Sequence, residues 1–215
     1  MERLLTYLCI FIGASGLCRA NVTCHNGFKN EFQENSSNAD TRDSIGRDEH
    51  LKFLGIPICG NINDFQNKLQ QKGFSYNPIS KSMPAGERWF NGIFANHEAS
   101  LAVYYLLNNK IVYSLTVYLN KSSYSEAVAL KELIDKTIYE SILEKYDTCM
   151  SEETDDGGIM YYIGEPVGPF ETDMGAIKVV VMPSATLGGY DVRIIYADMK
   201  GFNQWRENMS VNIGF

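Results

Sequence analysis

The sequence of 215 residues has no apolar run long enough to cross a bilayer about 30 Å thick. Acidic residues outnumber basic ones: the chain has 26 aspartates and glutamates but only 19 lysines and arginines, which gives a net charge of −7. Without a basic stripe the chain cannot neutralise nucleic-acid phosphates, and the same balance disfavours an acidic membrane surface. We therefore expect no nucleic-acid partner and no transmembrane span.

The residues that usually carry metal or nucleophilic chemistry are scarce. There are three histidines, and the five cysteines form no CxxC pair with zinc spacing. The acidic stretch EETDD at 152–156 lacks the spaced ligands and the glycine of a calcium loop. The only local histidine–acid pair is His97-Glu98, in an expected turn where the two side chains point apart. We expect no catalytic residue, no metal and no cofactor.

The first twenty residues, MERLLTYLCIFIGASGLCRA, have the features of a secretory signal peptide. An apolar run extends from Leu4 to Gly13, and the small side chains of Cys18 and Ala20 predict cleavage after Ala20. A buried first helix is one alternative. Another is a lipoprotein with an acyl anchor on Cys18 or Cys24. We expect an exported protein, periplasmic or secreted, with anchoring to the envelope as a variant.

The rest of the chain divides into a leader and one domain. Residues 21–49 are polar and without periodicity, which predicts a flexible leader. Residues 50–215 fit one domain, with a C-terminal extension over 201–215. Two cysteines, Cys59 and Cys149, lie inside it. They form either a disulfide, which export permits, or two small buried hydrophobes.

Two helices and two strand pairs are expected inside the domain. INDFQNKLQQK, from residue 62, is typical of a helix capped by Asn61 or Asn63. Ser123 and Glu126 make a capping box before a second helix that runs to Tyr146. A strand is expected near 87–96, a strand pair over 99–119 and another over 176–198.

Each half of the domain reads as a helix followed by three strands, with half-repeats at about 50–120 and 121–200. Strand residues correspond in kind between the halves: Val103/Tyr105 with Val179/Val181, and Val117/Leu119 with Ile194/Tyr196. We therefore predict an α+β fold in which two tandem helix-plus-antiparallel-sheet repeats form one curved sheet with helices on one face. The alternative is chance similarity between amphipathic strands.

These segments carry a family resemblance. HLKFLGIPICGNINDFQNKLQQKGF, a strand ending NGIFA, a helix ending LEKY and a final YDVRIIYAD resemble small secreted bacterial proteins whose fold is similar to that of β-lactamase inhibitor protein (BLIP-like). The resemblance covers residues 50–198 and implies two helix-and-sheet repeats. Cys59 departs from the acidic residue expected in such a GIPxxG segment. Because the shared positions are apolar residues and glycines, the resemblance implies a fold and assigns no contact residues.

Alternation along the strands predicts the two faces of the sheet. A two-residue turn at Asn108-Asn109 pairs Tyr105 with Val112 and Val103 with Ser114. The face expected beneath the helices is almost wholly apolar: Ala102, Tyr104, Leu106, Ile111, Tyr113, Leu115 and Val117. In the second half, Lys178, Asp191 and Arg193 fall opposite the core set Val179, Val181, Val192 and Ile194.

The other face mixes aromatic, hydroxyl and charged groups, which is typical of a protein- or glycan-binding surface. The candidate binding residues are Val103, Tyr105, Ser114, Thr116, Tyr118, Lys178 and Arg193. We expect a non-catalytic protein- or glycan-binding module, with an inhibitor-like protein as a variant. Alternatives are an ordinary half-wet sheet partly covered by the C-terminal extension with Trp205, an envelope assembly or structural lipoprotein, and a hydrolase whose Glu87, Glu98 and His97 meet only in three dimensions.

Overall fold

The computed structural model describes residues 50–145, 149–168, 171–185 and 187–212. The expected signal peptide, the leader and the two candidate acylation sites at Cys18 and Cys24 lie outside these residues. The elements, in chain order, are β1 Lys52–Phe53, β2 Ile56–Pro57, α2 Ile62–Gln71, β3 Ser75–Tyr76, the 3₁₀ helix η2 Pro78–Ser82, β4 Glu87–Phe94, β5 His97–Tyr105, β6 Val112–Lys121, α3 Tyr124–Lys145, β7 Cys149–Glu153, β8 Ile159–Ile163, β9 Pro166–Gly168, β10 Glu171–Thr172, β11 Gly175–Pro183, β12 Tyr190–Asp198 and α4 Met199–Asn212.

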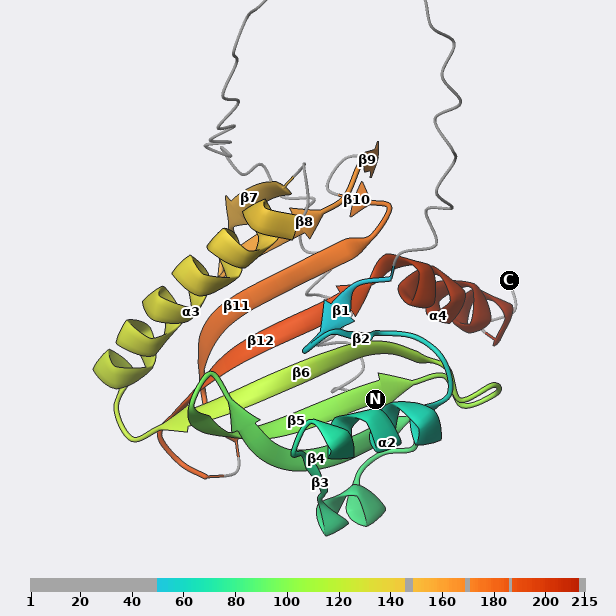
Figure 1. Ribbon diagram of the computed structural model, residues 1–215, viewed down its shortest axis with the longest axis horizontal. Helices are drawn as coiled ribbons and strands as arrows, with labels where there is room; N and C mark the ends of the chain where they lie inside the picture. Colours follow the sequence, from blue (N-terminus) through green and yellow to red (C-terminus); the bar gives the residue numbers. More distant parts are fainter. Residues whose placement is uncertain (1–49, 146–148, 169–170, 186, 213–215) are drawn as a thin grey trace, which may run out of the picture.

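An eight-stranded antiparallel sheet organises the domain, in the order β3-β4-β5-β6-β12-β11-β8-β7. Two small two-stranded sheets, β1-β2 and β10-β9, accompany it. The edge strands are short, since β3 has two residues and β7 has five. The prediction of an α+β fold with an antiparallel sheet is confirmed (Figure 1).

The first helix forms where its cap and its apolar spacing predict. The Asn61 side chain accepts a hydrogen bond from the Asn63 amide at 2.9 Å, which satisfies one free donor of the first turn. Ile62, Phe65 and Leu69 fall on one face and are buried. α2 then ends before Gly73, which has a φ of +88°.

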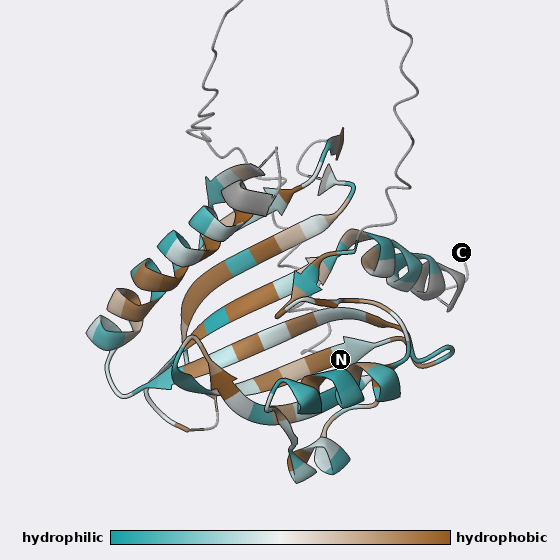
Figure 2. Cartoon of the chain, viewed as in Figure 1, coloured by the Kyte–Doolittle hydropathy of each residue, from teal (hydrophilic) through white to brown (hydrophobic). Residues whose placement is uncertain are grey.

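The second long helix is fixed at its start by the predicted capping box. The Ser123 hydroxyl accepts from the Glu126 amide and the Glu126 carboxylate accepts from the Ser123 amide, both at 3.3 Å. Its buried stripe is Leu130, Ile134, Ile138 and Ile142. Leu133 of the same helix is 60% exposed. Figure 2 shows hydrophobic and hydrophilic residues alternating along the turns of α3.

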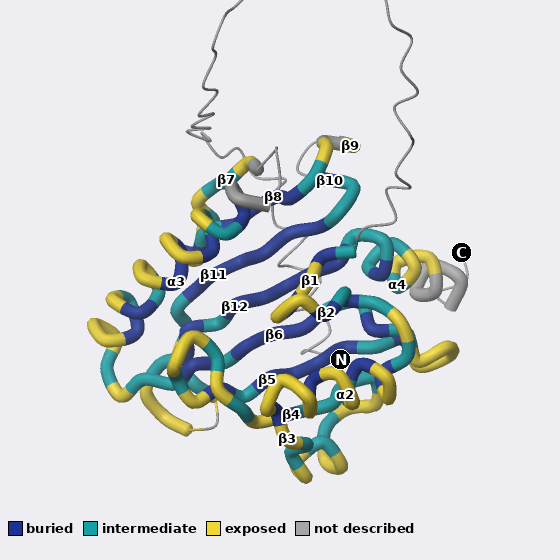
Figure 3. The backbone as a smooth tube through the Cα atoms, viewed as in Figure 1, coloured by how far each residue is buried: buried dark blue, intermediate teal, exposed yellow. Residues whose placement is uncertain are grey.

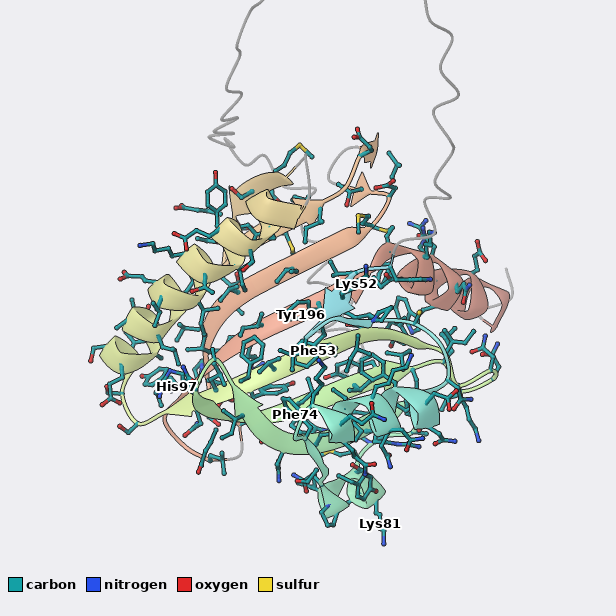
Figure 4. The ribbon with its side chains drawn as sticks, in the orientation of Figure 1. Lys52, Phe53, Phe74, Lys81, His97 and Tyr196 are labelled. Atoms are coloured by element: carbon teal, nitrogen blue, oxygen red, sulfur yellow. The ribbon has the colours of Figure 1, made fainter. Side chains whose placement is uncertain are left out.

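One continuous core lies between the sheet and the two helices. It joins residues of α2 and α3 to β4, β5, β6, β11 and β12, and Figure 3 shows the buried strands behind the more exposed helices. The β1-β2 hairpin lies over the sheet between α2 and α3 (Figure 1). Its Phe53 ring stacks on Phe94 at 5.6 Å and meets Phe74 and Tyr196 edge-on, which ties both halves of the sheet together (Figure 4).

A β-bulge decides which side chains of β5 face the helices. Tyr105 pairs with Val112 as predicted, although the turn spans residues 107–110 with Lys110 at a φ of +59°. Tyr113 is then an extra residue, so that Tyr104 pairs with Ser114 and Val103 with Leu115. Because one extra residue reverses the alternation, the predicted faces of β5 are wrong: Val103 and Tyr105 lie on the helix side, and Ala102 and Tyr104 on the other.

The sheet order separates Cys59 from Cys149, the two cysteines of the candidate disulfide. Cys59 precedes Gly60, whose carbonyl accepts from Val112 at the start of β6. Cys149 begins β7, four strands away from β6 across β12, β11 and β8. At about 4.8 Å per strand this separation is about 19 Å, far beyond the Cα distance of about 7 Å at which a disulfide can close.

The C-terminal extension forms a helix that the sequence analysis did not anticipate. α4 begins directly after β12 and lies beside the end of the sheet (Figure 1). Gly201 in its first turn lies close to Tyr113, where an added Cβ would meet the Tyr113 Cβ at 2.7 Å. Among the residues that the structure describes, no helix is both long and apolar enough to span a membrane.

Candidate functional site

We call the side of the large sheet turned away from α2 and α3 the outer face. The register places Ser114, Thr116 and Tyr118 of β6 on it, beside Ala197, Ile195 and Arg193 of β12. Lys178 of β11 pairs with Ile195 and shares this face. The structure thus brings five of the seven predicted binding residues to one face, over three neighbouring strands.

A row of stacked side chains crosses the outer face. The Trp89 indole on β4 lies 5.1 Å from the Tyr118 ring with an interplanar angle of 25°, and the Arg193 guanidinium on β12 lies 5.4 Å from the same ring. Between β4 and β6, the strand β5 offers only Ser100 and Ala102, which are small enough to let the two rings meet. We call this set the Trp89–Tyr118–Arg193 row.

Both ring faces of Tyr118 are therefore covered within the protein. β4 lies on one side of β6 and β12 on the other, so the indole and the guanidinium approach the phenol ring from opposite sides. Stacking and cation–π attraction each contribute about 0.5–1.5 kcal/mol. These contacts hold the three side chains against one another.

Polar groups hold the two ends of the row. The Trp89 indole N–H donates to Glu87 at 2.5 Å. At the other end, the Arg193 guanidinium lies 3.8 Å from the Asp191 carboxylate, which also accepts from the Asn120 amide at 2.9 Å. The Arg193 Nε is buried and has no hydrogen-bond partner among the described residues.

The outer face is only partly open. Thr116 and Val180 are each 1% exposed and Ile195 is 7% exposed, whereas Trp89 and Tyr118 are half-buried. The more accessible residues of this face are Trp89 on β4, Ser100 on β5 and Tyr118 on β6. Surface for a partner is concentrated at the row rather than spread over the whole sheet.

Lys178 is a poor contact residue because it is already engaged. Its ammonium group lies 2.8 Å from the Asp156 carboxylate, and its side chain is 6% exposed. Burial alone would raise the pKa of Asp156, but hydrogen bonds from Lys178 and Thr154 lower this pKa below its usual value. The pair fastens the β7-β8 turn to β11, a structural role.

Val103 and Tyr105 do not belong to the site. Both lie on the helix side of β5, and Val103 is fully buried. The Arg88 guanidinium lies 5.8 Å from the Tyr105 ring and donates to Gln66 of α2 at 2.8 Å. The bulge at Tyr113 explains this displacement.

The groups of the alternative hydrolase do not meet. His97 and Glu98 are adjacent residues of β5, not of a turn, and so point to opposite faces of the sheet. Glu87 pairs with Tyr104 and His97 with Phe94, seven residues further along β4. At 3.3 Å per residue the two backbones are about 23 Å apart. Within the described ranges, no group of three or more His, Cys, Asp or Glu side chains is placed to hold a metal ion.

Trp205 packs at the end of the sheet. Its indole stacks on Tyr113 at 6.1 Å and contacts Phe202 of the same helix at 5.2 Å. Burial, and secondarily the negative charge of Glu87, raises the pKa of Tyr113 to about 12. The bulge residue Tyr113 is thus the anchor for α4.

Trp89 is the site residue that sequence reasoning missed. A signal for it exists, because Phe94 and His97 close a two-residue hairpin through Ala95 and Asn96, both at positive φ. The pairing of β4 with β5, followed back from this turn, places Trp89 opposite Ala102, on the outer face. What the sequence could not supply was the bulge that puts Ala102 beside Thr116.

Comparisons with protein-family models, with curated proteins and with solved structures found no match.

Proposed function

We propose that this chain is an exported, non-catalytic module that binds a protein partner through the outer face, at the Trp89–Tyr118–Arg193 row. The observation that carries the proposal is the row itself. Trp, Tyr and Arg are the residue types that most often dominate protein interfaces, and here they are stacked, half-buried and adjacent. A rigid cluster loses little conformational entropy when a partner covers it.

The covered ring faces favour a protein over a glycan. A sugar binds an aromatic side chain by lying flat on an open ring face, and both faces of Tyr118 are taken. A specific observation nevertheless supports a glycan as second candidate. Asn77 donates to the exposed Asn91 at 3.0 Å, and Ser100 donates to the same oxygen at 3.4 Å, beside the row. Such clustered amides and hydroxyls suit sugar hydroxyl groups.

Export rests on the first twenty residues, and an envelope-anchored structural lipoprotein remains the alternative proposal. Metabolic labelling with a fatty-acid analogue separates the two. Label on the mature chain that is lost with Cys18→Ser or Cys24→Ser supports the lipoprotein, and unlabelled mature chain beginning at Asn21 supports the freely exported form.

The BLIP-like resemblance and the duplication are likewise proposals. The arrangement supports them: α2 is followed by β3, β4, β5 and β6, and α3 by β7, β8, β11 and β12. In the sheet the two sets run in mirrored order and meet at β6 and β12. We infer that two copies of one unit joined edge to edge. An experimental structure in which 62–121 cannot be superimposed on 124–198 would contradict this.

The binding proposal is tested by affinity capture from the exported fraction, followed by titration of the purified partner. Trp89→Ala and Tyr118→Ala should each weaken binding by roughly 30-fold, the effect of losing a hot-spot side chain worth about 2 kcal/mol. Tyr124→Ala, at a tyrosine that is 58% exposed on α3, is the matched control and should leave affinity unchanged. Equal affinity for all variants, with folding confirmed by circular dichroism, would refute the proposal.

A further inference from the structure

A second candidate site lies on the helix side, at the end of the sheet near the first turns of α3. A groove of about 550 Å³ opens there between β5, the end of β6 and α3. Figure 4 shows His97 at this end of the sheet. The volume of the groove is within the range of small-molecule binding sites. It is separate from the outer face and does not depend on the proposed function.

A lysine supplies the positive charge of the groove. The Lys121 ammonium donates to the His97 Nδ1 at 3.4 Å. No carboxylate lies within ion-pair distance of it among the described residues. An ammonium has three donors, so two remain for another acceptor. His97 acts as a positioning residue that turns this ammonium toward the groove.

A glutamate supplies the negative charge. Glu126 directs one oxygen, Oε2, to the Ser122 hydroxyl at 2.8 Å and to the Ser123 amide at 3.3 Å. These hydrogen bonds, with Ser122 the stronger cause, lower the pKa of Glu126. The carboxylate is therefore ionised at neutral pH and held in one orientation. Its second oxygen, Oε1, makes no hydrogen bond with the described residues.

An apolar wall completes the groove. Leu130 lies one turn beyond Glu126 on α3 and Leu133 lies two turns beyond it. Leu133 is 60% exposed, although leucine at this spacing is expected to be buried. An ammonium, a carboxylate and an apolar wall are the complement of a zwitterion with an apolar substituent. We propose that the groove binds a free α-amino acid with an apolar side chain.

Each part of such a ligand has a partner. The ligand carboxylate meets Lys121, the ligand ammonium meets Glu126, and the side chain lies against Leu130 and Leu133. Because charged groups at the surface contribute little in water, we expect weak binding, with a Kd on the order of 1 mM.

The test is a titration of isotope-labelled protein with L-leucine, followed by amide chemical shifts. Saturable shifts at Lys121, Ser122 and Leu133 are expected. Isoamylamine, which lacks the carboxylate, and 4-methylpentanoate, which lacks the ammonium, should each bind at least about fivefold more weakly, the loss of one such ion pair. Glycine should also bind more weakly, since it lacks the side chain.

Variants keep the proposal falsifiable. Lys121→Gln and Glu126→Gln should each weaken leucine binding as much as the matching fragment does, and Gln at 126 retains the helix cap. Lys136→Gln, at a lysine 74% exposed elsewhere on α3, is the control and should bind like the parent. No saturable shift with leucine, binding of either fragment as tight as that of leucine, or unchanged affinity in both groove variants would each overturn the proposal.

Discussion

Asp198 is a fully buried carboxylate that joins three parts of the chain. Its fully buried carboxylate accepts from the Leu51 amide at 2.9 Å, the His50 ring at 2.9 Å and the Gly201 amide at 3.0 Å. One side chain thereby joins the start of the domain, the end of β12 and the first turn of α4.

We predict that Asp198→Ala lowers the free energy of unfolding by about 3 kcal/mol, because it leaves buried donors without an acceptor. Asp198→Asn should lose less, since its amide oxygen still accepts. Urea denaturation measures both, with Asp64→Ala in the exposed first turn of α2 as control. A loss for Asp198→Ala no larger than that of the control would contradict the prediction.

A buried carboxylate on α3 gives a prediction about pH. Asp135 accepts from Lys131 at 2.8 Å and from the Tyr161 hydroxyl at 3.1 Å, yet burial outweighs these partners and raises its pKa. The folded state then binds this proton more tightly than the unfolded state. The contribution of Asp135 to the free energy of unfolding is therefore present at a pH below the pKa that this carboxyl has in the unfolded state. It is lost as the pH rises through the pKa of the folded state.

Asp135→Asn removes this titration. The variant should gain free energy of unfolding relative to the parent when the pH is raised from about 4 to about 7. Urea melts at both pH values measure the difference. A constant difference between variant and parent would show that Asp135 does not titrate in this way.

At the scale of elements, the contact between α4 and β6 depends on a glycine. Alanine is normally the better helix residue by about 1 kcal/mol, but a Cβ at Gly201 would lie 2.7 Å from the Tyr113 Cβ and 2.8 Å from its Cα. Neither atom is the free end of a side chain, so the helix must move. We predict that Gly201→Ala destabilises the protein by about 1–3 kcal/mol.

The displacement of α4 has its own spectroscopic signal. Trp205 stacks on Tyr113, so its fluorescence maximum should shift to longer wavelength in Gly201→Ala. Asn67→Ala, an exposed substitution in α2, is the control and should leave the spectrum unchanged. If Gly201→Ala leaves the emission unaltered and raises the free energy of unfolding, Tyr113 makes room for the added Cβ without loss of stability, which would contradict the prediction.

The elements predicted best are those governed by local chemistry. Asn61 and the Ser123–Glu126 pair mark both helix starts, and alternation correctly sets Val179 and Ile194 toward the core. The site was predicted less well because it depends on non-local pairing. One extra residue, Tyr113, reverses β5, and the entry of Trp89 into the row requires four strands in a known order.

At the scale of the whole molecule, the two halves share one core. The same hydrophobic cluster includes both α2 and α3, and β6 pairs with β12 over eight residue pairs. Neither half can therefore unfold without exposing the apolar surface of the other. We predict a single cooperative unfolding transition for the described domain.

The two tryptophans report on separate parts of the domain, because Trp89 lies on β4 in the first half and Trp205 lies on α4, which follows the second half. The variant Trp205→Phe leaves Trp89 as the only tryptophan, and Trp89→Phe leaves Trp205. In each variant, the urea transition measured by tryptophan fluorescence should coincide with the transition measured by circular dichroism. Two separated midpoints within one variant would contradict the shared core.

The shortness of the outermost strands bears on how this protein behaves at high concentration. An open sheet polymerises when a neighbour adds its backbone to an unpaired border. Here one border, β3, offers only two residues, and the other, β7, carries the acidic pair Glu152 and Glu153. At β3 too few backbone groups are free to pair with a second molecule, and at β7 the glutamates of two molecules would repel each other. The protein should therefore stay dispersed, while the rest of its surface remains available to other molecules.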